Sequence, residues 1–211
     1  SNNLNSDTST KPISLHINPD GMNKIKQKII LASRSPRRQQ LLQMMGIAFE
    51  VKTKETDEDY PEHLKNEQIV LHLASKKAIA FENEIQENEL LISADTIVVH
   101  QNKVLNKPAD YNEAIEMLTT LNGSMHEVYT GVCIASIHKK ELLYDKSEVY
   151  FRNYTVEDMH YYITNFKPYD KAGSYGIQDW FGLTCIEKIN GCFYNVMGLP
   201  TRKVYQQLIN F

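Results

Sequence analysis

The spacing of apolar and polar positions predicts short buried strands that alternate with amphipathic helices. Seven runs of apolar and β-branched residues are expected to form strands: 28–32, 48–51, 90–99, 125–137, 141–151, 183–189 and 192–196. Five segments are expected to form helices: one begun by Pro36 and stopped by Gly46, about 66–84, about 111–121, about 156–165, and one begun by Pro200. This order is not a regular βαβ repeat. It predicts an α/β fold with a mixed, partly antiparallel central sheet flanked by helices.

Residues with known capping and turn preferences mark the ends of these elements. Ser35 precedes Pro36 as a helix N-cap would. Two pairs have the spacing of a capping box: Asp110 with Glu113, and Thr155 with Asp158. The dipeptide Asn190-Gly191 predicts a hairpin between the last two strands. Residues 1–23 are polar and are expected to form a flexible tail before a single domain over 24–211.

Composition and charge narrow the classes of function. The net charge of −3 argues against a nucleic-acid partner, although a local basic pocket could still bind a small anion. Three cysteines form no CxxC pair and are expected to be reduced, as in intracellular proteins. No apolar run approaches the roughly 18 residues of a membrane span, so no membrane partner is expected. A cytoplasmic protein with a substantial core is the resulting prediction.

Arginines stand at an unusual place, the start of the helix begun by Pro36. Arg37 and Arg38 lie in its first turn, where the helix dipole disfavours positive charge by roughly 0.3–1 kcal/mol each. The conflict disappears if an anion binds there, because backbone N–H groups and guanidinium groups then converge on it. Solvated arginines that point away are the alternative interpretation.

Asp95 is a single carboxylate inside the apolar run 90–99. A buried carboxylate needs hydrogen bonds, a cation or access to solvent. Asp95 could hold a divalent metal, act as a base, or cap a neighbouring loop.

Two lysines and an acidic segment supply further candidates. Helical spacing puts Lys77, but not Lys76, near the middle of the apolar stripe of the helix at 66–84. It could meet an anion or extend to solvent. Lys107 follows a short hairpin after the strand of Asp95, and taken alone it is interpreted as ordinary surface charge. The acidic segment 55–59 offers oxygen ligands for magnesium, or it could simply be solvated.

Several common catalytic motifs are absent from the sequence. It contains no GxGxxG, no GxxxxGK[ST], no HExxH and no GxSxG. Phosphate chemistry without a P-loop remains the favoured class.

With these residues in hand, the sequence resembles the Maf family of nucleotide pyrophosphatases, relatives of the inosine triphosphate pyrophosphatases. The resemblance covers about 26–211 and rests on these motifs: LASRSPRR at 31–38 with Leu41-Leu42, SADT at 93–96, KP at 107–108, LNG at 121–123 with His126, YTGV at 129–132, DKAGSYGIQ at 170–178 and YNVMGLP at 194–200. The chain departs from the family at a few positions: Arg34, Asn106, Asn122 and the tripeptide 179–181. The last departure leaves the shape of the base pocket open.

The resemblance implies two lobes around a cleft, and hydrolysis of a nucleoside triphosphate to the monophosphate and pyrophosphate with Mg²⁺ or Mn²⁺. It implies that Asp95 is the proton acceptor. It also implies that Arg37, Thr96 and Gln178 influence substrate choice. The Gly-Ile-Gln sequence at 176–178 resembles the branch acting on dTTP and UTP. The family is also linked to arrest of cell division or septum formation.

The residues and the resemblance together give a working hypothesis for the site. Ser33, Arg37, Arg38, Lys77 and Lys107 are expected to hold the triphosphate, with Thr96 and Gln178 also contacting substrate. The expected metal ligands are Asp57, Glu58 and Asp95. The Gln178 amide suits uracil or thymine, and when flipped it could also pair with cytosine.

Two questions stay open at this point. The alternative function is a nucleotide-binding regulator of cell division or septum formation with little catalysis. A homodimer is also compatible with the sequence, because the apolar hairpin strand at 125–137 could pair across two copies.

Overall fold

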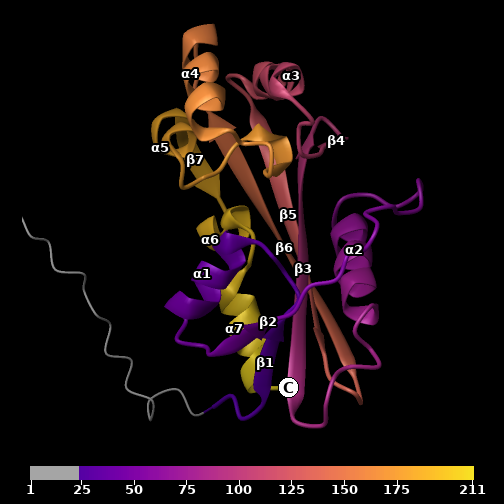
Figure 1. The fold of residues 1–211 in the computed structure, drawn as a ribbon. Helices are drawn as coiled ribbons and strands as arrows, with labels where there is room; N and C mark the ends of the chain where they lie inside the picture. Colours follow the sequence, from indigo (N-terminus) through magenta and orange to yellow (C-terminus); the bar gives the residue numbers. More distant parts are fainter. Residues whose placement is uncertain (1–23) are drawn as a thin grey trace, which may run out of the picture.

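The computed structural model describes residues 24–211, in which a seven-stranded mixed sheet forms the centre of the molecule (Figure 1). Six strands follow one another across the sheet in this order: β2 (Phe49–Val51), β1 (Lys28–Leu31), β3 (Glu89–His100), β5 (Met125–Ala135), β6 (Lys140–Phe151) and β7 (Ile186–Asn190). The short β4 (Lys103–Leu105) pairs with β3. Strands β2, β1 and β3 are parallel and the remaining pairs are antiparallel. The predicted mixed α/β architecture is confirmed.

Helices cover both faces of this sheet. Helix α2 (Glu67–Ile79) packs on one face, and α1 (Pro36–Met44) lies on the opposite face (Figure 1). The other helical elements are α3 (Tyr111–Leu121), α4 (Val156–Phe166), η2 (Ala172–Ser174), α5 (Trp180–Cys185), α6 (Phe193–Met197) and α7 (Thr201–Ile209). No helix within residues 24–211 is both long enough and apolar enough to cross a membrane.

Two apolar cores lie on the face opposite α2. One joins β1 and the first half of β3 to α1, α6 and α7, and it includes Leu31, Leu42 and Ile92. The other joins the far end of the sheet to α3, α4 and α5, and it includes Leu118 and Phe181. The described residues therefore form two lobes, as expected. The first lobe surrounds the core of α1, α6 and α7, and the second lobe surrounds the core of α3, α4 and α5.

The predicted helix caps are largely present. Ser35 accepts a hydrogen bond from the Arg38 backbone at the start of α1, and Thr155 with Asp158 forms a complete capping box on α4. Asp110 caps α3, but the Glu113 side chain accepts from Ala109 and completes no box.

The predicted hairpin of strands 183–189 and 192–196 is wrong in its second half. Strand β7 is present, but Phe193–Met197 is a short helix, α6, and 180–185 is helix α5. Asn195 explains the difference, because its side-chain amide is fully buried and donates to Val128 O and Ser147 Oγ. These tertiary contacts outweigh the β-propensity of the local sequence.

Candidate active site in the cleft between the lobes

The central strand β3 has a gap in its pairing along one edge. Strand β5 pairs with residues 91–99 of β3 on the other edge. Along the gapped edge, β1 pairs with 89–92 and β4 with 98–100, so 93–97 has no strand partner there among the described residues. Parallel strand β1 ends at this gap, a position where open α/β sheets often bind ligands.

Asp95 and Thr96 lie in this gap and face opposite sides of the sheet, because successive strand residues alternate. Asp95 faces α2 and contacts Lys77, whereas Thr96 contacts Arg38 from α1. A cleft of about 610 Å³ surrounds this edge and is lined by residues of both lobes. This volume is in the range of small-molecule sites.

The segment 33–38 forms one wall of the cleft and orients Arg38 closely. Arg38 Nε donates to Gly198 O at 2.8 Å, Nη2 donates to Thr96 Oγ1 at 3.0 Å, and Nη1 donates to Ser33 Oγ at 3.4 Å. Burial lowers the pKa of Arg38, and the charge of Asp95 opposes that shift. The guanidinium stays charged because its ordinary pKa is far above neutrality. The cleft therefore contains a fixed, partly buried cation.

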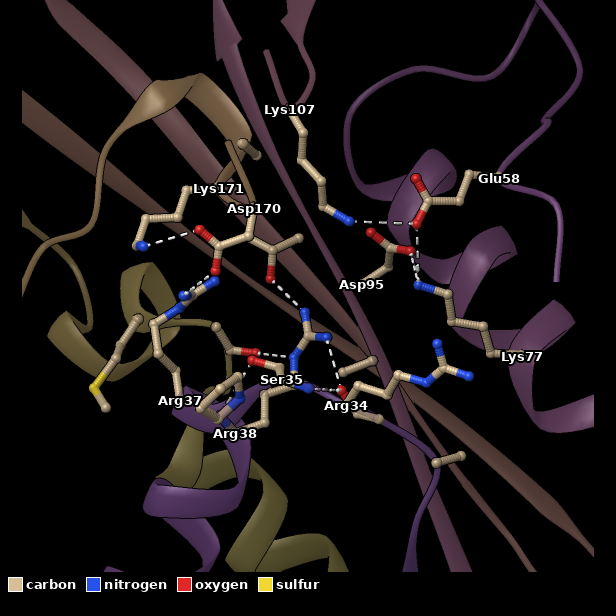
Figure 2. A pocket seen from close by; sticks show the side chains of 18 of the residues that line it. Arg34, Ser35, Arg37, Arg38, Glu58, Lys77, Asp95, Lys107, Asp170 and Lys171 are labelled. Carbon is tan, nitrogen blue, oxygen red and sulfur yellow. Dashed lines mark hydrogen bonds and ion pairs between the residues drawn. The ribbon is translucent and has the colours of Figure 1, made fainter. Parts of the chain in front are cut away.

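Arg37 reaches across the cleft to the second lobe (Figure 2). Its Nη1 lies 3.4 Å from Asp170 Oδ2, and Lys171 Nζ lies 3.0 Å from Asp170 Oδ1. Burial acts to raise the pKa of Asp170, but the hydrogen bond and charge of Lys171, with the charge of Arg37, lower it overall. An ionised Asp170 thus joins the two lobes through Arg37.

Asp95 is the buried carboxylate at the centre of the site. It is 8% exposed, and its Oδ2 lies 2.5 Å from Lys77 Nζ. Glu58 Oε1 lies 3.7 Å from both Lys77 Nζ and Lys107 Nζ (Figure 2). Helical spacing thus correctly predicts that Lys77 faces the sheet. Lys77 compensates the charge of Asp95, and Glu58 draws Lys107 to the same place.

A family model described as Maf-like protein matches residues 28–211. The chain belongs to the Maf family.

Relatives of this Maf protein cover most of its length. A protein named dTTP/UTP pyrophosphatase from Flavobacterium johnsoniae is 49% identical over 87% of this chain and 94% of its own. Proteins of the same name from Christiangramia forsetii and Bacteroides fragilis are 46% and 44% identical over 86% and 87% of this chain, and over 92% and 95% of their own.

One solved structure also shows similarity to this Maf protein. A nucleoside-triphosphatase / dITP/XTP pyrophosphatase from Mycobacterium abscessus matches 59% of this chain and 74% of its own, with 13% identity and a TM-score of 0.39. This similarity is too low to support a conclusion.

The expected metal ligands of this Maf protein are only partly brought together. Glu58 and Asp95 both approach Lys77 on the α2 side of the cleft. Asp57 instead pairs with Lys76 and does not line the cleft. Within residues 24–211, no three His, Cys, Asp or Glu side chains form a metal cluster. Two carboxylates fit Mg²⁺ nonetheless, because this ion is often held by one or two carboxylates together with substrate phosphates.

Gln178 lies at the margin of the site in this Maf protein. Its side chain is exposed, and its Nε2 lies 3.4 Å from Gln40 Oε1. The preceding residues Gly176 and Ile177 line the cleft, whereas Gln178 does not. A role for Gln178 in base recognition stays a prediction.

Several residues of the cleft have no role predicted for them individually from the sequence. Asp170 and Lys171 entered only as part of a motif, yet both line the cleft and connect to Arg37. In the sequence, only their adjacent opposite charges beside a glycine-containing segment indicate that they belong to a site. Gly131 likewise signals a close approach, since a Cβ there would lie 2.5 Å from the Val70 carbonyl.

Proposed function

We propose that this Maf protein hydrolyses dTTP and UTP to the monophosphate and pyrophosphate. The observation that carries the proposal is the buried Asp95, paired with Lys77 and facing a cleft lined by Arg37, Arg38 and Lys107. A basic cleft with one desolvated carboxylate combines a phosphate-binding surface with a proton acceptor. The names of the relatives support the reaction and the two nucleotides.

In the proposed reaction, Asp95 accepts a proton from the water that attacks the α-phosphorus. The bond between the α-phosphorus and the bridging oxygen breaks, and its electron pair leaves with pyrophosphate. Arg37, Arg38, Lys77 and Lys107 stabilise the negative charge that spreads over the leaving group. The proton then passes from Asp95 to solvent.

Glu58 and Asp95 would hold a divalent ion, Mg²⁺ or Mn²⁺, beside the phosphates. When bound, this ion would neutralise phosphate charge and polarise the phosphoryl oxygens. Lys77 and Lys107, which contact Glu58, would then be available to phosphate oxygens.

Base preference is assigned to the segment that ends at Gln178. Tyr162 Oη accepts from Gly176 N at 3.0 Å and donates to the Asp179 side chain at 2.8 Å, so one tyrosine contacts residues on both sides of Gln178. From this position the Gln178 amide offers the donor and acceptor that match the edge of uracil or thymine. Cytoplasmic location and homodimer formation stay predictions.

Pyrophosphate release from eight ribo- and deoxyribonucleoside triphosphates, each measured with and without magnesium, tests this function. We expect the highest kcat/KM for dTTP and UTP and little release without the metal. Tight nucleotide binding without pyrophosphate release would contradict the proposal and favour the regulatory alternative.

A further inference from the structure

A series of hydrogen bonds runs from Arg38 across one face of the sheet to α6. Arg38 Nη2 lies 3.0 Å from Thr96 Oγ1, and Thr96 Oγ1 lies 2.8 Å from Thr130 Oγ1. Thr130 Oγ1 donates to the Asn195 carbonyl at 3.0 Å. Thr96 and Thr130 are paired directly across β3 and β5, so their side chains meet on the same face. Four elements thus contribute to one continuous polar path.

The residues at its two ends determine which group donates and which accepts in each hydrogen bond of this series. Arg38 can only donate, so Thr96 Oγ1 accepts from it. The Asn195 carbonyl can only accept, so the single hydroxyl hydrogen of Thr130 is used there. The Thr96 hydroxyl must therefore donate to Thr130. Hydrogen bonds aligned in one direction polarise one another, which strengthens Thr96 as an acceptor for Arg38.

The arrangement also determines which donors Arg38 presents to the cleft. A guanidinium has five N–H groups. Nε and one hydrogen on each terminal nitrogen are used by Gly198, Ser33 and Thr96. Among the described residues, one N–H on Nη1 and one on Nη2 have no partner, so each can donate to a phosphate oxygen.

We propose that Thr130 is a positioning residue that orients Arg38 for phosphate binding. It acts through Thr96, because it takes the Thr96 hydroxyl hydrogen and leaves the Thr96 lone pairs directed at Arg38. Thr130 is fully buried and does not line the cleft, so it cannot contact substrate itself. This role rests on the proposed function, in which Arg38 holds the triphosphate.

Two substitutions of Thr130 distinguish the effect of its hydroxyl on activity from the effect of its side-chain shape. Thr130→Val keeps the shape but removes the acceptor of the Thr96 hydroxyl, which weakens the hydrogen bond between Thr96 and Arg38. We expect kcat/KM for dTTP to fall about tenfold, the size of one hydrogen bond to a charged group. Thr130→Ser keeps the hydroxyl and should stay within about twofold of wild type. In Thr130→Val the Asn195 carbonyl loses the hydrogen bond from Thr130 but keeps a second one, from Gly198 N at 3.0 Å. This carbonyl is therefore not left without a donor.

The double variant Thr96→Val with Thr130→Val distinguishes positioning from general damage. Two facing apolar side chains leave no unsatisfied hydroxyl, so the melting temperature should recover relative to Thr130→Val. Thr96→Val also removes the acceptor of Arg38, so kcat/KM should remain at or below that of Thr130→Val. Activity that returns together with stability would overturn the proposal, as would wild-type kcat/KM in Thr130→Val. Thr120→Val on α3, outside the cleft, is the matched control and should be unaffected.

A binding measurement separates this proposal from the proposed function. If wild type releases no pyrophosphate, the function fails, and the role of Thr130 is still measured with α,β-imido-dUTP by calorimetry. Thr130→Val should raise Kd for this analogue about tenfold. An unchanged Kd would overturn the positioning role.

Discussion

Asp95 and Lys77 form the ion pair on which the chemistry of the cleft depends. A carboxylate that is 8% exposed would be costly alone, and Lys77 Nζ at 2.5 Å offsets that cost. Both residues line the cleft, so the pair is desolvated on one side and accessible on the other. The pair thus places a buried carboxylate at the cleft, in the position that a proton acceptor needs.

Asp95→Asn keeps the size of the side chain and removes the proton acceptor. We expect kcat for dTTP to fall by about a hundredfold or more, which is the contribution of a general base. Binding of α,β-imido-dUTP should change little, because the basic residues remain. Steady-state pyrophosphate release and calorimetry measure the two effects. Turnover close to wild type would remove Asp95 from the role of base.

Glu58→Gln and Asp57→Asn test which acidic side chain serves the metal. Glu58 lines the cleft beside Lys77 and Lys107, whereas Asp57 is 62% exposed and pairs with Lys76. Glu58→Gln should raise the magnesium concentration for half-maximal activity about tenfold. Asp57→Asn is the matched control and should leave it unchanged. The reverse ranking in a magnesium titration would assign the ligand to Asp57.

At the scale of elements, the distance between α2 and the sheet sets the position of Lys77. Gly131 is paired with Asp95 across β3 and β5, directly beneath α2. A Cβ at this position would lie 2.5 Å from the carbonyl carbon and oxygen of Val70. The absence of a side chain therefore allows the close packing that brings Lys77 to Asp95.

Gly131→Ala should push α2 away from the sheet. We expect a loss of about 1–3 kcal/mol in the free energy of unfolding, which is typical of overpacking. The kcat should fall as well, because the Lys77–Asp95 pair separates. Urea unfolding and steady-state kinetics on the same preparation check both effects. Unchanged stability and kcat would show that α2 has room to adapt.

The local parts of the fold could be predicted, whereas contacts between distant segments could not. The N-cap at Ser35 and the capping box at Thr155 depend on neighbouring residues, and both are present. The position of Lys77 follows from helical periodicity in the same way. The local sequence predicts a strand where α6 lies, because the contacts of Asn195 with β5 and β6, which decide its conformation, are between distant segments.

In the site too, contacts between distant segments could not be predicted from the sequence. The sequence pointed to 33–38 and Asp95 because each conflicts with its local environment, through misplaced charge or buried charge. The pairing of Arg37 with Asp170 joins residues 133 positions apart, and nothing local indicates it. Asp57 and Glu58 are adjacent acidic residues in one segment, and only the fold distinguishes the one that lines the cleft.

At the scale of the whole molecule, the second lobe contains a buried histidine that should make the free energy of unfolding depend on pH. His126 is 1% exposed, and its Nε2 lies 2.6 Å from Tyr175 Oη. Its ring centroid lies 4.9 Å from that of Phe151. Burial, with a smaller effect of His100, lowers the pKa of His126 to about 3. The folded protein therefore keeps this imidazole neutral at pH values where an unfolded chain protonates it.

The direction of the pH effect follows from proton binding. Below its ordinary pKa of about 6.5, His126 binds a proton in the unfolded state but not in the folded state. Its contribution to stability is therefore complete above about pH 6.5 and is lost progressively as the pH falls toward about 3. The loss is on the order of 1.4 kcal/mol per pH unit within that window.

His126→Phe keeps an aromatic ring at this position and removes this titration. The free energy of unfolding, measured in urea between about pH 4 and 6, should then depend less steeply on pH, by about 1.4 kcal/mol per unit. The absolute stability can also change, because Tyr175 loses its partner, so the slope is the decisive quantity. His138→Gln is the matched control, since His138 is 70% exposed and should leave the slope unaltered. Equal slopes in wild type and His126→Phe would mean that His126 becomes protonated in the folded protein, and the second lobe would then admit water at its centre.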